Sequence, residues 1–256
     1  VAGVFPEQAL YTLLAARGSC MVKACGEDAG TMMAIGGPRE RLEELLRDLR
    51  GIYPANFNSP FQTVVSGRRA DLEALARMLE GSDLQAQFIP VSCGFHSPFV
   101  SDAARSFEKE LASVACAAPA LPVYSNYLAA PFPSDSEQIR TVLSAHLSHP
   151  VRFMDEIRRM HEDGARVFIE AGPGSVCSKL ISEILVGKQF AAVACDSKAP
   201  RHGMIQLLHA LGQLFAHGVR MQLEPMFSRR PVRRLLEDGV PGKKGPKRPQ
   251  LTWMVS

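Results

Sequence analysis

The chain has 256 residues, of which 46% are hydrophobic and 21% charged, and its formal net charge is +3. That length can bury a full hydrophobic core in one or two domains, and the composition is ordinary for a globular enzyme. No run of 18 apolar residues occurs, so no membrane-spanning helix is expected. The first residues lack a basic segment followed by an apolar core, so we expect no secretory signal and a cytoplasmic protein.

The basic charge is concentrated at the C-terminal end. From residue 228 onward eight Lys or Arg stand against two acidic residues, whereas the preceding part carries 21 basic and 24 acidic residues. The fold itself therefore has no excess of positive charge that would predict a nucleic-acid partner. Residues 227–256, rich in Gly, Pro and like charge, predict a linker or tail.

Cysteine spacing argues against a metal site. The six cysteines form no Cys-x-x-Cys pair and no metal-ligand pattern. Scattered in this way, they are typical of reduced, partly buried thiols in a cytosolic protein. They are Cys20, Cys25, Cys93, Cys116, Cys177 and Cys195.

Hydrophobic spacing and turn residues predict the elements of the N-terminal part. These are helices over 6–18, 39–50 and 70–80, strands over 31–36, 63–67 and 84–91, and a polar segment over 56–60. We interpret the order as strand, helix, strand, strand, helix, strand, which is the ferredoxin-like split βαβ pattern. Residues 31–89 are therefore predicted to form a small subdomain inserted into a larger one.

The larger subdomain is predicted to comprise residues 1–30 and 90–226. Its second part alternates helices and strands, which favours a mostly parallel sheet covered by helices and an α/β fold class. The helices are expected over 101–114, 136–147, 151–163, 178–185 and 204–217, and the strands over 121–128, 165–171 and 190–195.

A histidine lies at the junction between the strand over 84–91 and the helix that opens near residue 101. It belongs to Gly-Phe-His-Ser-Pro at 94–98, where the proline keeps Ser97 out of the helical region and makes a corner. A neutral imidazole at such a corner can face a cleft and act as a general base near pH 7. On this stretch alone, a packed or surface histidine is the commoner alternative.

Five motifs in order resemble a known family. They are Ala-Gly-Val-Phe at 2–5 with Arg-Gly at 17–18, Asn-Phe-Asn-Ser-Pro at 56–60 with Gln62, Gly-Phe-His-Ser-Pro at 94–98, Pro-Val-Arg-Phe at 150–153, and Phe-Ile-Glu-Ala-Gly-Pro-Gly at 168–174. Together they resemble the malonyl-CoA:acyl carrier protein transacylases and the acyltransferase domains of polyketide and polyunsaturated fatty acid synthases. The resemblance covers residues 1 to about 225 and implies an α/β-hydrolase-like large subdomain that carries the small insertion.

The resemblance implies a role for three of these residues. His96 would be the catalytic base. Phe95 is a bulky aromatic residue, which in the family goes with use of the small malonyl group rather than the branched methylmalonyl group. Arg17 would hold the free malonyl carboxylate through two charge-assisted hydrogen bonds, which a lysine could not match. The alternative for Arg17 is an arginine at a helix C-terminus that complements the helix dipole.

The other matching positions are polar. Asn56, Asn58 and Gln62 match a loop whose amides would bond the thioester or the pantetheine arm, and an Asx-type turn is the alternative. His146 stands where the family has a glutamine whose main-chain carbonyl orients the catalytic histidine. His146 and His149 could also be considered as metal ligands, but no third ligand stands at a supporting spacing, so no metal is expected.

The family's nucleophile is a serine in Gly-His-Ser-x-Gly, and no Gly-x-Ser-x-Gly occurs in these 256 residues. We expect the chain to begin just downstream of that serine and to be inactive alone. An intact parent is expected to move malonyl from coenzyme A to its serine and then to the phosphopantetheine of an acyl carrier protein. It would do so among neighbouring synthase domains, with no tightly bound cofactor. The alternative is a non-catalytic scaffold or carrier-protein docking module.

Overall fold

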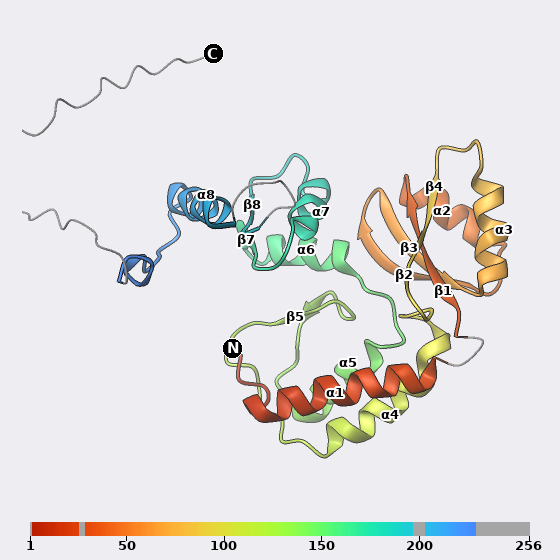
Figure 1. Cartoon of the computed structure of the whole chain (residues 1–256), viewed down its shortest axis with the longest axis horizontal. Helices are drawn as coiled ribbons and strands as arrows, with labels where there is room; N and C mark the ends of the chain where they lie inside the picture. Colours follow the sequence, from red (N-terminus) through yellow and green to blue (C-terminus); the bar gives the residue numbers. More distant parts are fainter. Residues whose placement is uncertain (1, 26–28, 197–202, 229–256) are drawn as a thin grey trace, which may run out of the picture. The chain divides into compact units, whose positions relative to one another are not determined.

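A computed structural model describes residues 2–25, 29–196 and 203–228. The chain divides into two compact units, Val1–His217 and Gly218–Ser256, and the contacts discussed below lie within the first. No helix in the described ranges is long and apolar enough to cross a membrane. The elements (Figure 1) are α1 (Glu7–Ala24), β1 (Thr31–Gly36), α2 (Arg39–Leu46), β2 (Ile52–Ser59), β3 (Gln62–Gly67), α3 (Arg69–Leu79), β4 (Gln85–Ile89), η1 (Pro98–Val100), α4 (Ser101–Ala112), β5 (Tyr124–Ser125), β6 (Ala130–Pro131), α5 (Ser136–Ala145), α6 (Phe153–Glu162), β7 (Val167–Glu170), α7 (Val176–Ile184), β8 (Ala191–Ala194), α8 (Gly203–Ala216) and η2 (Glu224–Met226).

Residues 31–89 form a four-stranded antiparallel sheet with the strand order β2-β3-β1-β4. Side chains alternate between the two faces of a strand, so one face of β1 carries Met33 and Ile35. These side chains meet the apolar stripes of α2 and α3, including Leu42 and Leu72, in one buried cluster. The described elements between residues 31 and 89 follow the order strand, helix, strand, strand, helix, strand.

The opposite face of this sheet is also buried. Met32 on β1, Ala55 on β2 and Val64 on β3 form a second cluster, and Phe95 packs against it. Phe95 directly precedes His96, so the small sheet contacts the histidine corner through its second face. The position of the corner thus depends on packing from residues far away in the sequence.

The polar segment predicted over 56–60 is instead the second half of β2. The amide of Phe57 donates to the carbonyl of Val151 at 2.8 Å, and the amide of Val151 donates to the carbonyl of Ala55 at 2.8 Å. The register of β2 against β3 shifts near Pro54 and again before Ser59. Those irregularities break the alternation of polar and apolar residues, so the sequence looked like a turn.

Three helices, α1, α4 and α5, pack around a third cluster that includes Leu13, Phe107 and Leu147. In Figure 1, α1 and α4 run side by side. The prediction that α1 ends at Gly18 was wrong, because the helix continues to Ala24. A glycine inside a helix costs about 1 kcal/mol, and burial of Cys20 in the cluster helps to offset that cost.

The sequence predicted a mostly parallel sheet for the larger subdomain, but the described residues there form only two small two-stranded sheets. One parallel pair is present there, β7 with β8, and the predicted strand over 121–128 shrinks to β5, which pairs antiparallel with β6. Pro119 and Pro122 have no amide hydrogen to donate to a strand partner, which explains why the strand is so short. The hairpin turn closes through Ala129, whose φ is 54°.

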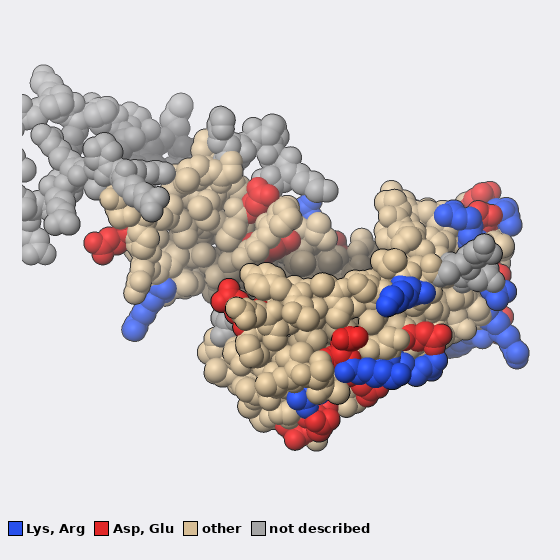
Figure 2. Space-filling model, turned by 60° about the horizontal axis from the view of Figure 1, so that its bottom comes forward, with Lys and Arg blue, Asp and Glu red and all other residues tan. Residues whose placement is uncertain are grey.

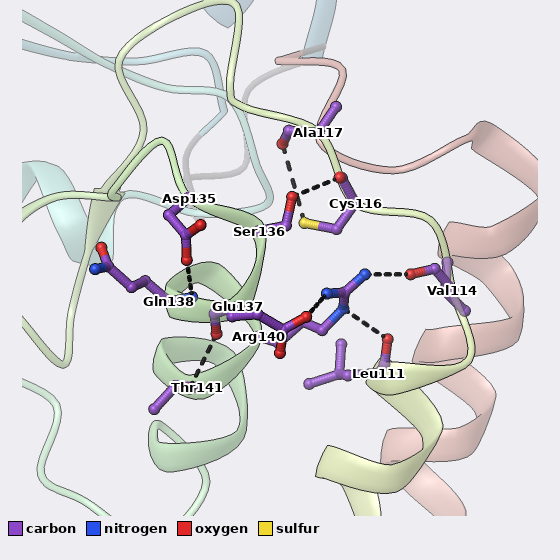
Figure 3. Close-up of polar contacts among 10 residues, drawn as sticks. All are labelled: Leu111, Val114, Cys116, Ala117, Asp135, Ser136, Glu137, Gln138, Arg140 and Thr141. Atoms are coloured by element: carbon purple, nitrogen blue, oxygen red, sulfur yellow. Dashed lines mark hydrogen bonds and ion pairs between the residues drawn. The ribbon is translucent and has the colours of Figure 1, made fainter.

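Arg140 ties α5 to the end of α4 (Figure 3). Its guanidinium donates to the carbonyl of Leu111 at 3.2 Å and to that of Val114 at 2.9 Å. It also pairs with Glu137 one turn earlier on α5. Leu111 lies in the last turn of α4 and Val114 just beyond its C-cap residue. The two hydrogen bonds therefore hold α5 against the end of α4.

Charged side chains on the surface are mixed in sign. On the face drawn in Figure 2, acidic and basic side chains lie interspersed. The ion pairs found among the described residues, such as Arg105 with Asp102 and Arg159 with Asp163, join residues three or four apart on one helix. Exposed pairs of this kind contribute little to stability, because water screens the charges. The fold therefore depends on its apolar clusters.

We predict that Leu72→Ala destabilises the small sheet strongly. Leu72 is fully buried between α3 and the sheet, and such truncations cost about 2–5 kcal/mol in the free energy of unfolding. Met78→Ala, on the exposed side of the same helix, should cost less than about 1 kcal/mol. Urea unfolding followed by circular dichroism measures both. Equal losses in the two variants would contradict the described core.

Candidate active site

The histidine corner begins with a capped turn. Ser97, which is 1% exposed, donates its hydroxyl to the carbonyl of Gly94 and accepts the amide of Phe99 at 3.4 Å. Pro98 then opens the short helix η1. His96 itself has a φ of 54°, the left-handed region that non-glycine residues seldom adopt. Such a conformation costs about 1–3 kcal/mol and persists only where neighbouring contacts hold it.

Those contacts come from two other parts of the chain. The hydroxyl of Ser66 on β3, fully buried, donates to the carbonyl of Phe95 at 2.6 Å. The amide of Gly94 donates to the carbonyl of Ala29 at 2.7 Å. A Cβ at Gly94 would lie 3.0 Å from the Phe99 ring. The backbone on the N-terminal side of the histidine is therefore held by hydrogen bonds and close packing.

The imidazole of His96 is oriented by a main-chain carbonyl. Its Nδ1 lies 2.9 Å from the carbonyl oxygen of His146, and the amide of His96 donates to the carbonyl of Leu147 at 3.2 Å. A carbonyl only accepts, so Nδ1 carries the hydrogen, and in the neutral ring Nε2 is the nitrogen that can accept a proton.

Burial sets the protonation state of this ring. It lowers the pKa of His96, and the positive charge of Arg17 acts in the same direction, while the carbonyls of His146 and His149 oppose both. The lowered pKa keeps the ring neutral at pH 7. A neutral ring with a fixed tautomer is what a general base requires.

His146 ends helix α5 as its C-cap residue. Its ring centroid lies 5.2 Å from that of His96, and its Nε2 is buried without a hydrogen-bond partner among the described residues. Burial, with smaller effects from His96 and Arg17, lowers the pKa of His146 to about 4. The side chain is thus a neutral packed ring, and its carbonyl is the group that contacts His96.

Arg17 lies on α1, half-buried and close enough to lower the pKa of both histidines. No carboxylate pairs with it within the described ranges. Because α1 continues to Ala24 and Lys23 occupies the last turn, Arg17 is too far from the helix end to complement its dipole strongly. A half-buried guanidinium that lacks a carboxylate partner and lies near a neutral histidine is suited to binding an anion.

The remaining predicted residues lie on or beside the small sheet. Phe95 is half-buried between the cluster of α1 and α4 and that of the sheet. Asn56 forms a parallel bridge with Val151. Asn58 donates its amide to the side-chain oxygen of Gln62 at 2.8 Å. Among the described residues, no hydrogen bond links these amides to the histidine corner.

The structure thus brings His96, Arg17 and His146 together and leaves Asn58 and Gln62 as a separate pair. Sequence reasoning missed Ser66, since a serine at the end of an apolar strand gives no signal. No group of three or more metal-ligating side chains gathers in the part of the chain that the structure describes. The constellation can accept a proton and hold an anion.

Comparison with known proteins decides the family. The family model described as the acyl transferase domain matches residues 2–220. The chain belongs to the acyl transferase domain family. The histidine corner, α1 with Arg17 and the sheet over 31–89 all lie within the matched part.

Three relatives in this family illustrate the match. A polyunsaturated fatty acid synthase chain of Thraustochytrium is 32% identical over 233 residues, which are 86% of this chain and 8% of that protein. The polyketide biosynthesis malonyl CoA-acyl carrier protein transacylase BaeC of Bacillus velezensis is 36% identical over 185 residues, 72% of this chain and 63% of that protein. The chain thus spans less than two thirds of either curated relative. The crystal structure of the malonyl CoA-acyl carrier protein transacylase from Clostridium perfringens superimposes with a TM-score of 0.73 at 26% identity, covering 86% of this chain and 69% of that one.

We predict that His146→Gln makes stability less sensitive to acid. Between its ordinary pKa of 6.5 and its folded pKa of about 4, His146 is protonated in the unfolded chain but not in the folded one. Acidification through this window therefore favours unfolding. The variant keeps the main-chain carbonyl and removes the titrating ring. Between pH 7 and 5 its free energy of unfolding should therefore fall by about 1–2 kcal/mol less than that of the parent.

Urea unfolding at the two pH values measures this difference. Burial raises the pKa of Glu156 to about 7, so its titration in the same pH window stabilises the fold in acid, opposite to the effect of His146. Each variant is therefore compared with the parent protein, in which Glu156 contributes equally. His149→Gln, which changes an exposed histidine nearby, is the matched control. If His149→Gln reduced the pH dependence of the free energy of unfolding as much as His146→Gln does, the assignment of this pH dependence to the His146 ring would be wrong.

Proposed function

We propose that this chain is part of a malonyl-selective acyltransferase domain of a fatty acid or polyketide synthase in the cytoplasm. It would act on malonyl-CoA and pass the acyl group to the phosphopantetheine thiol of an acyl carrier protein. The observation that carries the proposal is a neutral, carbonyl-oriented His96 near Arg17, which has no carboxylate partner among the described residues. The printed names of BaeC and of the Clostridium perfringens enzyme support the substrate and the partner by similarity.

In this proposal His96 moves one proton in each half-reaction. Its Nε2 takes the proton of the serine hydroxyl as the oxygen attacks the thioester carbonyl, and it returns the proton to the departing coenzyme A thiolate. In the second half it takes the proton of the phosphopantetheine thiol as the sulfur attacks the acyl-serine ester, and it returns this proton to the serine oxygen as the ester C–O bond breaks. The His146 carbonyl stabilises the imidazolium that forms transiently, as it accepts the hydrogen on Nδ1 throughout.

Arg17 would select the acyl group. A malonyl group has a free carboxylate and an acetyl group has none, and the planar guanidinium can bind a carboxylate through two parallel hydrogen bonds. Phe95, packed between two clusters, would limit the space beside the acyl group and favour malonyl over branched analogues. Asn56, Asn58 and Gln62 would line the path of the pantetheine arm through their amides.

The same proposal extends to the architecture. Residues 31–89 would be a ferredoxin-like subdomain inserted into an α/β-hydrolase-like subdomain formed by residues 1–30 and 90–226. The antiparallel order β2-β3-β1-β4 and its two helices support the first part, and the parallel pair β7-β8 with its helices supports the second. The predicted tail over 227–256 lies outside the described residues except for its first two, and we propose that it leads towards a neighbouring synthase domain.

A second candidate is a non-catalytic module that keeps the acyl transferase fold as a scaffold or carrier-protein docking piece. The observation in its favour is that no Gly-x-Ser-x-Gly occurs in the 256 residues. The sequence encoded upstream of Val1 separates the two candidates. An in-frame Gly-His-Ser-x-Gly supports the enzyme, whereas a translation start at Val1 supports the scaffold.

We predict that Arg17→Ala, made in the synthase that carries this chain, lowers kcat/KM for malonyl-CoA by about 30-fold or more, because removing one partner of a desolvated charge pair costs about 2–5 kcal/mol. Acetyl-CoA has no carboxylate, so its rate should change little. Arg17→Lys should restore only part of the malonyl rate. His96→Ala, the contrast variant, should lower kcat/KM for malonyl-CoA and acetyl-CoA by the same factor. If Arg17→Ala also lowered both values equally, Arg17 would have only a structural role.

For the 256-residue chain by itself we predict no covalent malonyl intermediate. None of its serines stands in the sequence that activates the family's nucleophile. Incubation with malonyl-CoA followed by intact-mass measurement tests this. A stoichiometric malonyl adduct would refute the expectation, and peptide mapping would then identify the nucleophile, with Ser19, Ser175 and Cys93 as the first candidates.

A further inference from the structure

Two cysteines far apart in the sequence pack into one apolar cluster beside the histidine corner. Cys25 is the C-cap residue of α1, and Cys93 lies three residues before His96. Both pack into the cluster formed by α1, α4 and the corner. The amide of Gly94, next to Cys93, donates to the carbonyl of Ala29, four residues after Cys25, at 2.7 Å. Main-chain hydrogen bonding and shared packing therefore bring both cysteines into the same part of the fold.

The two thiols differ in their access to solvent. Cys93 is fully buried, whereas Cys25 is half-buried. Burial raises the pKa of Cys93 to about 12, and the nearby Cys25 acts in the same direction. A small oxidant from solvent would thus reach the sulfur of Cys25 first, while Cys93 remains a protonated thiol within the same cluster.

We propose that Cys25 and Cys93 form a reversible disulfide when hydrogen peroxide oxidises the chain. The Cys25 sulfur attacks one peroxide oxygen, the O–O bond breaks, and the products are a Cys25 sulfenic acid and water. The Cys93 sulfur then attacks the sulfenic sulfur, the S–S bond forms, the S–O bond breaks, and the departing hydroxide takes the thiol proton as a second water. Two thiols lose two electrons in total and the peroxide gains them. A dithiol reductant reverses the bond by exchange.

The bond would link the two elements that carry the candidate active site. Cys25 terminates the helix that bears Arg17, and Cys93 belongs to the strand-to-helix corner that bears His96. A cross-link between them fixes the end of α1 against the corner and constrains the unfolded chain. Any effect on acyl transfer rests on the proposed function, whereas formation of the disulfide does not.

The experiment uses the full 256-residue chain. The reduced protein is treated with hydrogen peroxide, its remaining thiols are alkylated after denaturation, and the product is measured by intact mass and by mapping of non-reduced peptides. The expected product carries four alkyl groups, since one disulfide leaves four of the six thiols free and removes two hydrogen masses. Peptide mapping should give one linked pair that contains Cys25 and Cys93. Treatment with dithiothreitol should restore six alkylatable thiols.

Two variants make the result decisive. Cys25→Ser replaces only the sulfur of a half-buried side chain and should abolish the linked pair, so that Cys93 remains available to the alkylating reagent. Cys177→Ser, at an exposed cysteine, is the matched control and should form the pair as the parent does. A pair that joins Cys93 to Cys20 instead, or a Cys25 oxidised to sulfinic acid while Cys93 stays a free thiol, would overturn the proposal.

Discussion

One hydrogen bond organises this molecule, from the Nδ1 of His96 to the carbonyl of His146. This bond forms only if His96 adopts its left-handed conformation and lies beside both the end of α5 and the second face of the small sheet. Arg140 fixes α5 against α4, and Ser66 fixes the carbonyl that precedes the histidine. Each anchor is a polar contact between segments far apart in the sequence. The apolar clusters supply the stability, and these polar contacts define which single arrangement is stable.

His146 shows why a main-chain contact tolerates a change of side chain. The ring makes no hydrogen bond through its Nε2 among the described residues, and it titrates far below neutrality. The contact to His96 comes from the peptide carbonyl, which every residue type carries and which a substitution leaves in place. A buried, neutral histidine at this place makes the fold less stable in acid but does not disturb the orientation of the base.

The sequence predicted the elements well wherever periodicity was strong. Helices α3, α4 and α5 and strands β1 and β3 lie within a few residues of their expected bounds, because their apolar positions repeat at the helical or strand period. The predictions were wrong at β2, at β5 and at the end of α1. At β2 and α1 a long-range contact decided the outcome, because Val151 pairs with β2 and the cluster around Cys20 extends α1. At β5 the cause is local, since Pro122 within the predicted strand has no amide hydrogen to donate to a partner.

The candidate site was predictable as far as the family resemblance reached, and no further. The proximity of Arg17 to His96 could be inferred only from the motifs, since nothing in residue spacing places α1 against the corner. Neither the role of Ser66 nor the packing of Cys25 and Cys93 into one cluster gives a signal in the sequence, because each depends on how the small sheet and α1 pack onto the corner. That packing is a property of the tertiary fold, which local patterns do not encode.

The edge of β2 has a consequence for domain engineering. Residues 55 and 57 exchange main-chain hydrogen bonds with Val151, and Ser59 donates to Glu183 of α7 at 2.5 Å. A chimera that imports residues 31–89 from a relative therefore also replaces one half of these contacts. The main-chain hydrogen bonds can form with any residue type in the imported segment. A buried Ser59 hydroxyl without a carboxylate partner, in contrast, would destabilise the chimera. Grafts should keep positions 59 and 183 from the same parent, even though 124 positions separate them.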